Sequence, residues 1–430
     1  MPAKRSFSIF YRMGIAAERE LLDSGRDLYD GIVISAYFAA FYRSSSPVIL
    51  RTLNKPFFFD PATYAFARDI ENIRRDGRLR KSFQKLVDYY GGDFKSILAI
   101  RQLIPRDFFS GRQLNTKRIS DFVARTLDLQ LNILSPPTGI HESLLKYAEL
   151  AEEEQQTEAR LQPSFLVAPY FSFESIDDPW YEVAVRLAAE SRKQHDGRLF
   201  VPICFSKELL LARDSFQKIR RDFNGFDGYL LWPSSFNDDR AAYEYLMGLA
   251  EFVKALAAEK KPIYFLYGGF YVPLVLRILG IDGGYCRGIC YGEARDVDAP
   301  MATGGGAPKR YYYEKTYSKL PESVARAFFS DNPRELCECR VCSLILGQIM
   351  NSPREERIPA FFDLLDYTLV RKHFMENHAK QIEYVETLSS KQILEMLVDQ
   401  IEKTRDFTPY NVSNMHVARW LTALQELSHQ

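Results

Sequence analysis

The sequence predicts an α/β fold, a (β/α)8 TIM-type barrel that carries a helical insertion and a helical C-terminal subdomain. Eight short apolar runs bounded by turn residues are typical of buried strands, and amphipathic segments of helical period separate the later ones. The eight runs are residues 6–10, 32–37, 56–60, 165–168, 199–204, 228–232, 263–267 and 286–291. Such alternation fits either a barrel or a doubly wound sheet, and the count of eight favours the barrel.

The order of these runs divides the chain into four parts. Residues 1–64 hold the first barrel strands, and residues 65–160 read as a helical insertion. Residues 161–320 complete the barrel, and residues 321–430 form the helical C-terminal subdomain. Because βα loops emerge at the C-terminal ends of barrel strands, an insertion after the third strand is expected over that face.

The composition supports a large buried core and limits the partners. Of 430 residues, 46% are hydrophobic and 14% aromatic, and 56 basic residues balance 56 acidic ones. No global positive field therefore attracts nucleic acid, so a polyanion would have to bind at a local patch. The start of the chain lacks the apolar run of a signal peptide, and no stretch is apolar enough to span a membrane. A cytoplasmic protein is expected, in a reducing compartment that suits its scattered cysteines.

Three of the six cysteines stand close together, at Cys337, Cys339 and Cys342. They cannot all pair with one another, since a disulfide joins two thiols with suitable Cβ vectors. A soft, tetrahedral ion such as Zn²⁺, held by three cysteines and one histidine, resolves the crowding. Four protein ligands leave no open position for water, so the zinc is expected to be structural. Three reduced thiols beside a helix start are the alternative.

The fourth ligand is expected from residues 370–385, which contain His373 and His378. Five positions apart on a helix, the two imidazoles point to different faces, so we do not expect both to bind one ion. His373 is preferred because it is the closer of the two to the cysteines along the chain. The alternative is that neither histidine binds a metal.

This cysteine spacing, with a distant histidine and just after an eight-stranded barrel, resembles the tRNA-guanine transglycosylases. Other segments agree with that family in their order. They are residues 30–37, 58–66, 226–229 (Phe-Asp-Gly-Tyr), 267–269 and 280–282. The resemblance implies a pentosyltransferase that replaces guanine in nucleic acid through a glycosyl intermediate on a carboxylate.

The sequence departs from this family at the catalytic strands. The family's nucleophilic aspartate lies on the last strand, but residues 284–293 contain no aspartate, and its second aspartate falls near residues 169–170. Glycosyl transfer still needs a carboxylate nucleophile and a proton donor. Glu293, at the end of the last strand, is therefore the candidate nucleophile. The alternative is a loop acid that pairs with Arg287 or Arg295.

Asp60 is the second catalytic candidate, because it ends the third apolar run and aligns with the aspartate that reads the guanine edge in the family. A carboxylate can accept two N–H donors, whereas a helix cap or a turn is the alternative role. Candidates for substrate binding are Tyr37, Gly268, Gly269 and Asp177. Tyr37 would stack on the base, the glycines would let it approach the backbone, and Asp177 is one of the acids after the fourth strand. Core packing and a glycine turn are the alternatives.

Two basic segments are candidates for contacting phosphate groups. The first is residues 74–81 within the insertion, and the second is Lys309 with Arg310, beside three tyrosines. A basic surface helix without a ligand is the alternative for either segment.

The resemblance predicts a base-exchange enzyme that inserts a deazaguanine base into nucleic acid. DNA is favoured over tRNA, because no RNA-binding module is evident after the barrel and the catalytic strands are altered. The expected cofactor is structural Zn²⁺, and the expected partners are nucleic acid and a purine or deazaguanine base. Assembly as a homodimer or with a partner subunit stays open. The alternatives are a non-catalytic partner subunit and an N-glycosidase that leaves an abasic site.

Overall fold

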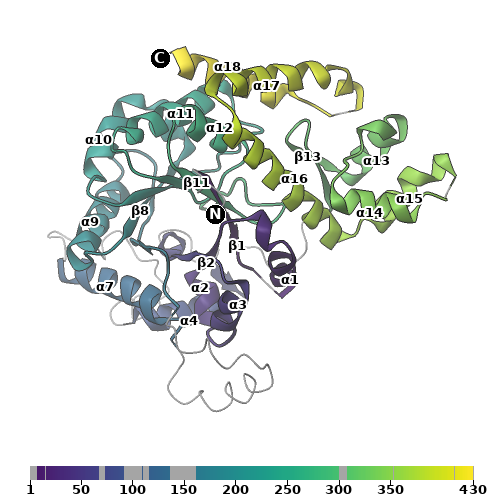
Figure 1. The fold of residues 1–430 in the computed structure, drawn as a ribbon. Coiled ribbons are helices and arrows are strands. Elements are labelled where there is room, and N and C mark those ends of the chain that lie inside the picture. The colour runs from purple at the N-terminus through teal and green to yellow at the C-terminus, as the bar shows by residue number, and fades with distance from the viewer. Residues whose placement is uncertain are drawn as a thin grey trace.

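Eight parallel strands form a nearly closed barrel in the computed structural model, as the eight apolar runs predict (Figure 1). The structure describes residues 7–14, 16–66, 73–91, 109, 116–135, 161–299, 308–351, 353–410 and 412–429. Neighbouring strands hydrogen-bond in the order β3-β2-β1-β11-β10-β9-β8-β6. Their bounds are β1 Phe7–Arg12, β2 Gly31–Ser35, β3 Phe57–Asp60, β6 Leu166–Val167, β8 Leu199–Ser206, β9 Gly228–Ser234, β10 Ile263–Phe265 and β11 Gly283–Arg287. A short strand, β7 (Ser172–Phe173), adds to β8.

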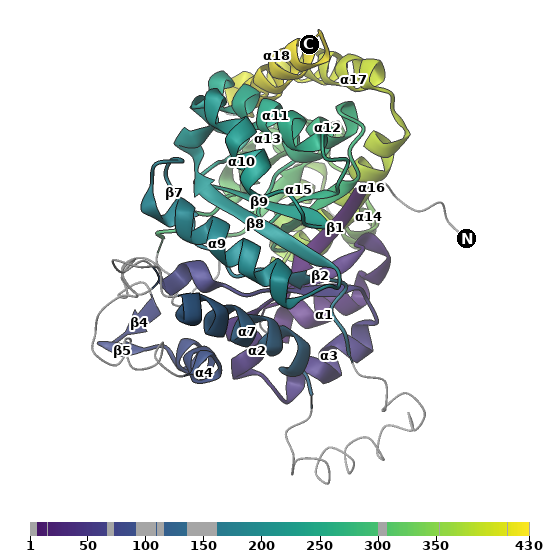
Figure 2. The same ribbon diagram turned by 90° about the vertical axis from the view of Figure 1, so that its left-hand side faces the viewer.

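Helices cover the outside of the strands, and Figure 2 shows α9 and α10 over β8 and β9. The helices between the barrel strands are α1 Ala16–Ser24, α2 Ala36–Phe41, α3 Ser45–Leu53, α4 Lys81–Tyr90, α7 Thr116–Asn132, α9 Pro179–Gln194, α10 Phe216–Asp222, α11 Tyr243–Ala257 and α12 Tyr271–Ile278. A search of the described ranges for an apolar helix of membrane-spanning length finds none.

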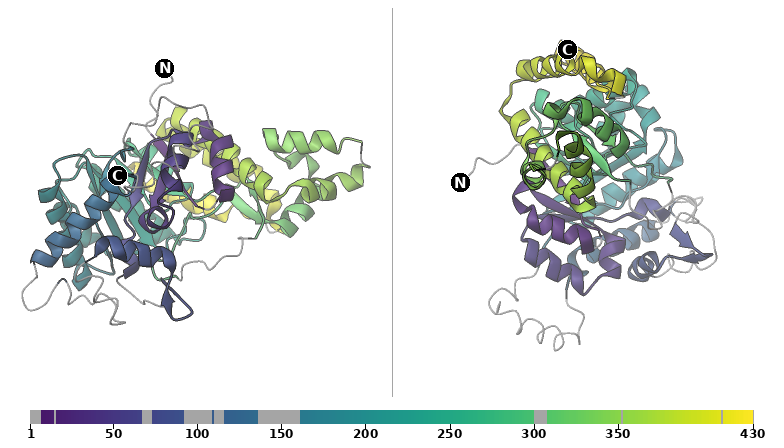
Figure 3. Two further views of the ribbon diagram at one scale, coloured as in Figure 1. Left: turned by 90° about the horizontal axis from the view of Figure 1, so that it is seen from below. Right: turned by 90° about the vertical axis from the view of Figure 1, so that its right-hand side faces the viewer.

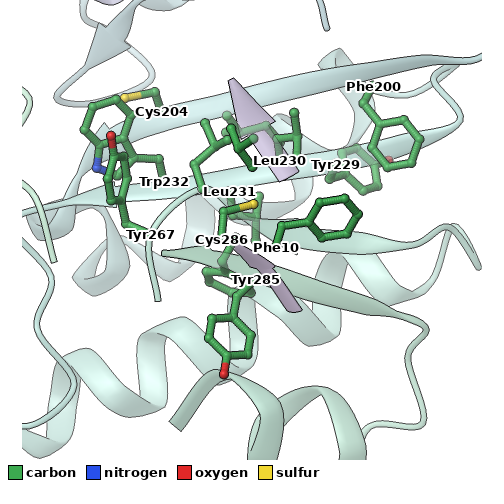
Figure 4. Packing of buried hydrophobic residues seen from close by; sticks show 14 of the residues in the cluster. Phe10, Phe200, Cys204, Tyr229, Leu230, Leu231, Trp232, Tyr267, Tyr285 and Cys286 are labelled. Carbon is green, nitrogen blue, oxygen red and sulfur yellow. The ribbon is translucent and has the colours of Figure 1, made fainter. Parts of the chain in front are cut away.

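Aromatic side chains fill the barrel interior, as Figure 4 shows for part of this core. Phe165 stacks on Phe200 with ring centroids 4.0 Å apart, and Phe10 meets the edge of Tyr264 at 5.6 Å. Trp232 lies farther along the strands, toward their C-terminal ends, beside Tyr267 (Figure 4). The barrel is therefore a packed core rather than a pore, and only the ends of its strands are open to a ligand.

The barrel has one seam, between β3 and β6, where side chains take the place of a regular backbone ladder. At one end of the seam the Ser164 N–H donates to the Phe57 carbonyl at 2.8 Å. The Gln130 carboxamide, from α7, then pairs with both backbone groups of Val167, at 2.8 and 2.9 Å. At the other end the Thr63 hydroxyl bonds to the N–H and the carbonyl of Tyr170. These contacts satisfy backbone groups that would otherwise be buried without partners.

The insertion is only partly helical, because its basic segment forms a hairpin instead of the expected helix. Strands β4 (Arg74–Arg75) and β5 (Arg78–Leu79) pair around Asp76 and Gly77, whose φ angles are 53° and 72°. Two consecutive positive φ angles are what a two-residue hairpin turn requires, and Asp-Gly is a favoured pair for it. Helices α4 and α7 follow. Much of the predicted insertion, residues 92–108, 110–115 and 136–160, lies outside the described residues.

A C-terminal module follows the barrel and projects from one side of it (Figure 3). It consists of β12 Arg310–Tyr313, β13 Ser318–Pro321, α13 Glu322–Asp331, α14 Arg340–Gln348 and α15 Arg357–Leu364. The side chains of the β12–β13 hairpin alternate between its two faces. Tyr311, Tyr313 and Leu320, on one face, enter the module's own core. Tyr312, on the opposite face, joins the core of the barrel. The hairpin therefore connects the two cores.

The last three helices return from the module to the barrel. They are α16 Tyr367–Thr387, α17 Ser390–Lys403 and α18 Met415–His429. In α16, Val370 belongs to the module's core, while Phe374 and Ile382 belong to the core of the barrel. Helix α18 lies along α11 (Figure 1), and Trp420 donates a hydrogen bond to the Asp238 carbonyl at 2.9 Å. The module's core therefore begins near Tyr311, and the helices after His373 pack on the barrel.

Candidate functional site

The structure brings together the four residues predicted as metal ligands. The Sγ atoms of Cys337, Cys339 and Cys342 and one ring nitrogen of His373 lie within 4.8 Å of one another, and all four residues are buried. Cys339 is the N-cap of α14, so the three sulfur atoms stand at the positive end of that helix. This close group of soft ligands could hold a metal ion, and its Cys3His composition suits zinc.

The orientation of His373 suits the binding of a metal ion through Nδ1. Its Nδ1 lies 3.2 Å from Cys339 Sγ and 3.3 Å from Cys342 Sγ. Its Nε2 lies 2.7 Å from the Tyr312 carbonyl, which can only accept, so Nε2 carries the hydrogen. In the neutral imidazole, Nδ1 then presents its lone pair toward the sulfurs, as the backbone-anchored histidines of zinc sites do. The Tyr311 ring stacks on the imidazole at 4.4 Å and fixes its plane.

His378 lies on a different face of α16 and belongs to the barrel. Its Nε2 hydrogen-bonds to the Tyr285 hydroxyl, and its ring stacks on Phe374 at 5.0 Å. Burial, and then the nearby charges of Arg287 and Lys319, hold the pKa of His378 well below its usual range. The choice of His373 over His378 as the fourth ligand is therefore consistent with the geometry of the cluster.

Asp60 lies at the C-terminal end of β3 in a cluster that we call the mouth cluster. This cluster consists of Arg12, Asp60, Tyr64, Tyr170, Trp232, Tyr267 and Arg295. Asp60 is only 1% exposed. Its Oδ2 pairs with Arg12 Nη1 at 3.0 Å, and its Oδ1 accepts from the Tyr170 hydroxyl at 2.8 Å. Arg12 also donates to the Leu266 carbonyl at 3.0 Å, and its guanidinium lies 4.1 Å from the centre of the Tyr267 ring. The acceptors of Asp60 are thus occupied by the protein's own donors.

Aromatic rings surround this ion pair. Trp232 meets Tyr64 edge to face at 4.6 Å and lies 4.7 Å from Tyr267. Arg295 donates to the Tyr267 hydroxyl at 3.3 Å. Tyr37, predicted to stack on a base, stacks instead on Phe83 of α4 at 4.9 Å. The insertion therefore anchors the Tyr37 ring.

Glu293 lies in a second cluster, between the barrel and the module. It pairs with Lys319 of β13 and, at 3.4 Å, with Arg287 of β11. Burial alone would raise the pKa of Glu293, but Lys319 and Arg287 outweigh it and lower this pKa to about 2. Glu293 is thus a charged carboxylate throughout the physiological range. Among the described contacts it shares no partner with Asp60, so the structure places the two predicted catalytic acids in separate clusters.

Asp238 and Asp239 are acids that no sequence motif singled out, and they line a small cavity together with Glu293. Its volume, about 10 Å³, is just enough for one water molecule. Burial, and then the charge of Asp239, raises the pKa of Asp238 to about 8. Burial, and then Glu293, raises the pKa of Asp239 to about 6. Their position in the loop after β9 was the sequence signal for them, since strand ends carry the chemistry of barrels.

The pKa of Asp238 predicts a pH-dependent stability. The unfolded carboxyl titrates near pH 4 and the folded one near 8, so stability falls as the pH rises between these values. The neutral Asp238→Asn variant lacks this loss and can still accept from the Tyr271 N–H. We therefore compare the free energy of unfolding of this variant with that of the natural chain by urea denaturation. The difference in favour of the variant should be larger at pH 8 than at pH 5 by at least about 1 kcal/mol. Asp177→Asn, at an exposed aspartate, is the control and should show the same dependence of stability on pH as the natural chain. If the curve of stability against pH for Asp238→Asn runs parallel to that of the natural chain, the assignment is contradicted.

The other residues predicted to bind substrate are Gly268, Gly269 and Asp177, and each has neighbours within the protein. A Cβ on Gly269 would lie 2.1 Å from Asp238 Oδ1, so the space beside this glycine is taken by that carboxyl group. Gly268 is buried, and its Cβ would lie 3.1 Å from a Val272 methyl carbon. Asp177 is exposed in the turn before α9, where its N–H donates to Ser175 Oγ at 3.3 Å. No described contact connects it to either acid cluster.

Comparisons with known proteins add no assignment to this geometry. No protein-family model matches the chain, and a search of curated proteins finds no match either. The resemblance to the tRNA-guanine transglycosylases therefore rests on the residues and spacings of the chain itself.

Proposed function

We propose that the chain is a base-exchange enzyme of the guanine-transglycosylase type, which acts on nucleic acid, with DNA favoured over tRNA. In this reaction Glu293 attacks C1′ of a nucleotide, the C1′–N bond breaks, and the purine leaves with a proton donated by Asp238. An incoming deazaguanine base then attacks C1′, returns its N–H proton to Asp238, and releases Glu293. The zinc would hold the module against the barrel and take no part in the chemistry.

The observation that carries this proposal is the state of Glu293. A carboxylate nucleophile has to be ionised, and Lys319 and Arg287 keep Glu293 charged at neutral pH. Asp238, which lines the same cavity, keeps its proton in the same pH range. Neighbouring carboxyl groups whose pKa values are pushed apart in this way are typical of acid and nucleophile pairs in glycosyl chemistry. Asp239 lines the same cavity as Glu293, whereas Asp60 belongs to the mouth cluster.

A test uses purified protein with DNA or with tRNA, and with labelled guanine or a labelled deazaguanine base. We expect label to enter DNA, and Glu293→Gln to reduce the rate by at least about a thousandfold, since the amide cannot act as the nucleophile. Glu174→Gln, at an exposed glutamate after β7, is the matched control and should keep full activity. Abasic sites without incorporation would assign an N-glycosidase instead. If no label enters either nucleic acid and no base is lost, the proposal is wrong.

A second candidate, a non-catalytic partner subunit, is favoured by the occupied acids. Asp60 is neutralised by Arg12, and Glu293 has two cationic partners. A subunit that only binds nucleic acid should retain that binding after Asp60→Asn and after Glu293→Gln. An electrophoretic mobility shift measured beside the incorporation assay separates the two functions.

A further inference from the structure

An open cleft of about 240 Å³ lies between the loop after β11, the β12–β13 hairpin and α16. Glu293 and Lys319 form the boundary between this cleft and the small acid-lined cavity. One water molecule needs about 10–15 Å³ of volume measured in this way, so the cleft can hold a ligand much larger than a single ion.

The cleft carries more positive than negative charge. Arg310, Lys319 and Arg371 line it, and Glu293 is its only acidic lining residue within the described part of the chain. Arg310 is exposed on the first position of β12. The neighbouring Lys309 does not offer its charge to a ligand in the cleft, because its Nζ donates to the carbonyls of Phe362 and Leu365 at 3.0 Å.

Aromatic rings orient one of these cations. The Arg371 guanidinium lies 4.4 Å from the centre of the Tyr367 ring and 5.8 Å from that of Tyr291. Its Nη2 donates to the Tyr367 hydroxyl at 3.2 Å, and Glu18 lies 3.8 Å from its Nη1. A guanidinium held in a fixed plane is well suited to bind a phosphate through two parallel hydrogen bonds, and the tyrosines offer faces for a planar ring.

We infer that this cleft is a binding site for a nucleotide unit, whose phosphate group contacts Arg310 and Arg371 while its base lies against Tyr291 or Tyr367. Inorganic phosphate would use only the two arginines and leave most of the cleft empty. The inference goes beyond base exchange, since it concerns binding alone and holds for any reaction or for none.

The test measures binding of 5′-GMP, guanosine and inorganic phosphate to the full chain by calorimetry, with no incoming base present. We expect 5′-GMP to bind at least tenfold more tightly than either guanosine or phosphate, and its affinity to fall as salt is added. Arg310→Ala should weaken 5′-GMP binding by about tenfold, because a charge-assisted hydrogen bond to phosphate is lost. Arg371→Lys, which keeps the charge beside Glu18, should weaken it several-fold through loss of the planar fork.

The matched control is Arg334→Ala, an exposed arginine in the same module that does not line the cleft, and it should bind 5′-GMP normally. Equal affinity for 5′-GMP and guanosine would overturn the phosphate contact, and equal affinity for 5′-GMP and phosphate would overturn the assignment to a nucleotide. Unchanged binding in both Arg310→Ala and Arg371→Lys would overturn the location. Since no base exchange is measured, a chain that fails the incorporation assay can still pass this test.

Discussion

Cys339→Ser is expected to lose stoichiometric zinc and to unfold the C-terminal module while the barrel stays folded. Cys339 is one of the four candidate ligands, and it also caps α14. A structural zinc contributes on the order of 10 kcal/mol in small zinc domains, more than a core of this size is expected to supply alone. The module's core is separate from that of the barrel, so the damage should stay within it.

Two measurements check this expectation, metal analysis of the purified protein and hydrogen exchange. Backbone amides of β12, α13, α14 and α15 should lose protection, whereas those of β1 and β9 should keep it. Cys204→Ala, which changes a buried cysteine of the barrel outside the cluster, is the control and should retain zinc. A Cys339→Ser protein with unchanged metal content would refute the metal site.

Arg12→Met is expected to destabilise the barrel by about 3–5 kcal/mol, because it leaves Asp60 buried without its cationic partner. The two side chains are only 12% and 1% exposed, so solvent screens their interaction weakly. Methionine keeps much of the volume of the arginine stem, so the loss reports mainly the unpaired charge. Urea denaturation at pH 7 measures the change.

A double variant separates the stability lost through the unpaired charge from the stability lost through altered packing. Arg12→Met with Asp60→Leu removes both charges, and we expect it to recover more than half of the lost stability, since a buried ion pair can be replaced by apolar groups at small cost. Arg186→Met, in the exposed pair with Glu182, is the matched control and should change stability by no more than about 0.5 kcal/mol. If the double variant is no more stable than Arg12→Met, the effect comes from packing.

Most of the barrel could be predicted from the sequence, because its strands are buried on both faces and read as continuous apolar runs. The last strand is the exception, since β11 spans Gly283–Arg287 whereas the apolar pattern indicated residues 286–291. Gly283 and Gly284 look like turn residues in the sequence. In the structure they allow close approach of neighbouring strands, because a Cβ on Gly284 would lie 2.1 Å from the Ser8 carbonyl oxygen. Only the pairing of distant strands reveals this role.

The candidate metal site was predictable because three of its four residues are neighbours in the sequence, and their spacing alone indicates the chemistry. The acid clusters were harder, because their members come from distant segments. The partner of Asp60 is Arg12 of β1, and one of the two partners of Glu293 is Lys319 of β13. A single sequence gives the residue types at strand ends but not which of them meet.

The seam between β3 and β6 has a consequence for the folding of the chain. A barrel whose backbone ladder closes completely has no free edge, but here the backbone groups of Val167 at the edge of β6 pair with the Gln130 carboxamide of α7. Until α7 docks, the edge of β6 presents unpaired backbone groups beside apolar residues, as aggregation-prone strands do. We therefore expect the docking of α7 to decide whether a newly made chain closes its own barrel or pairs with another copy.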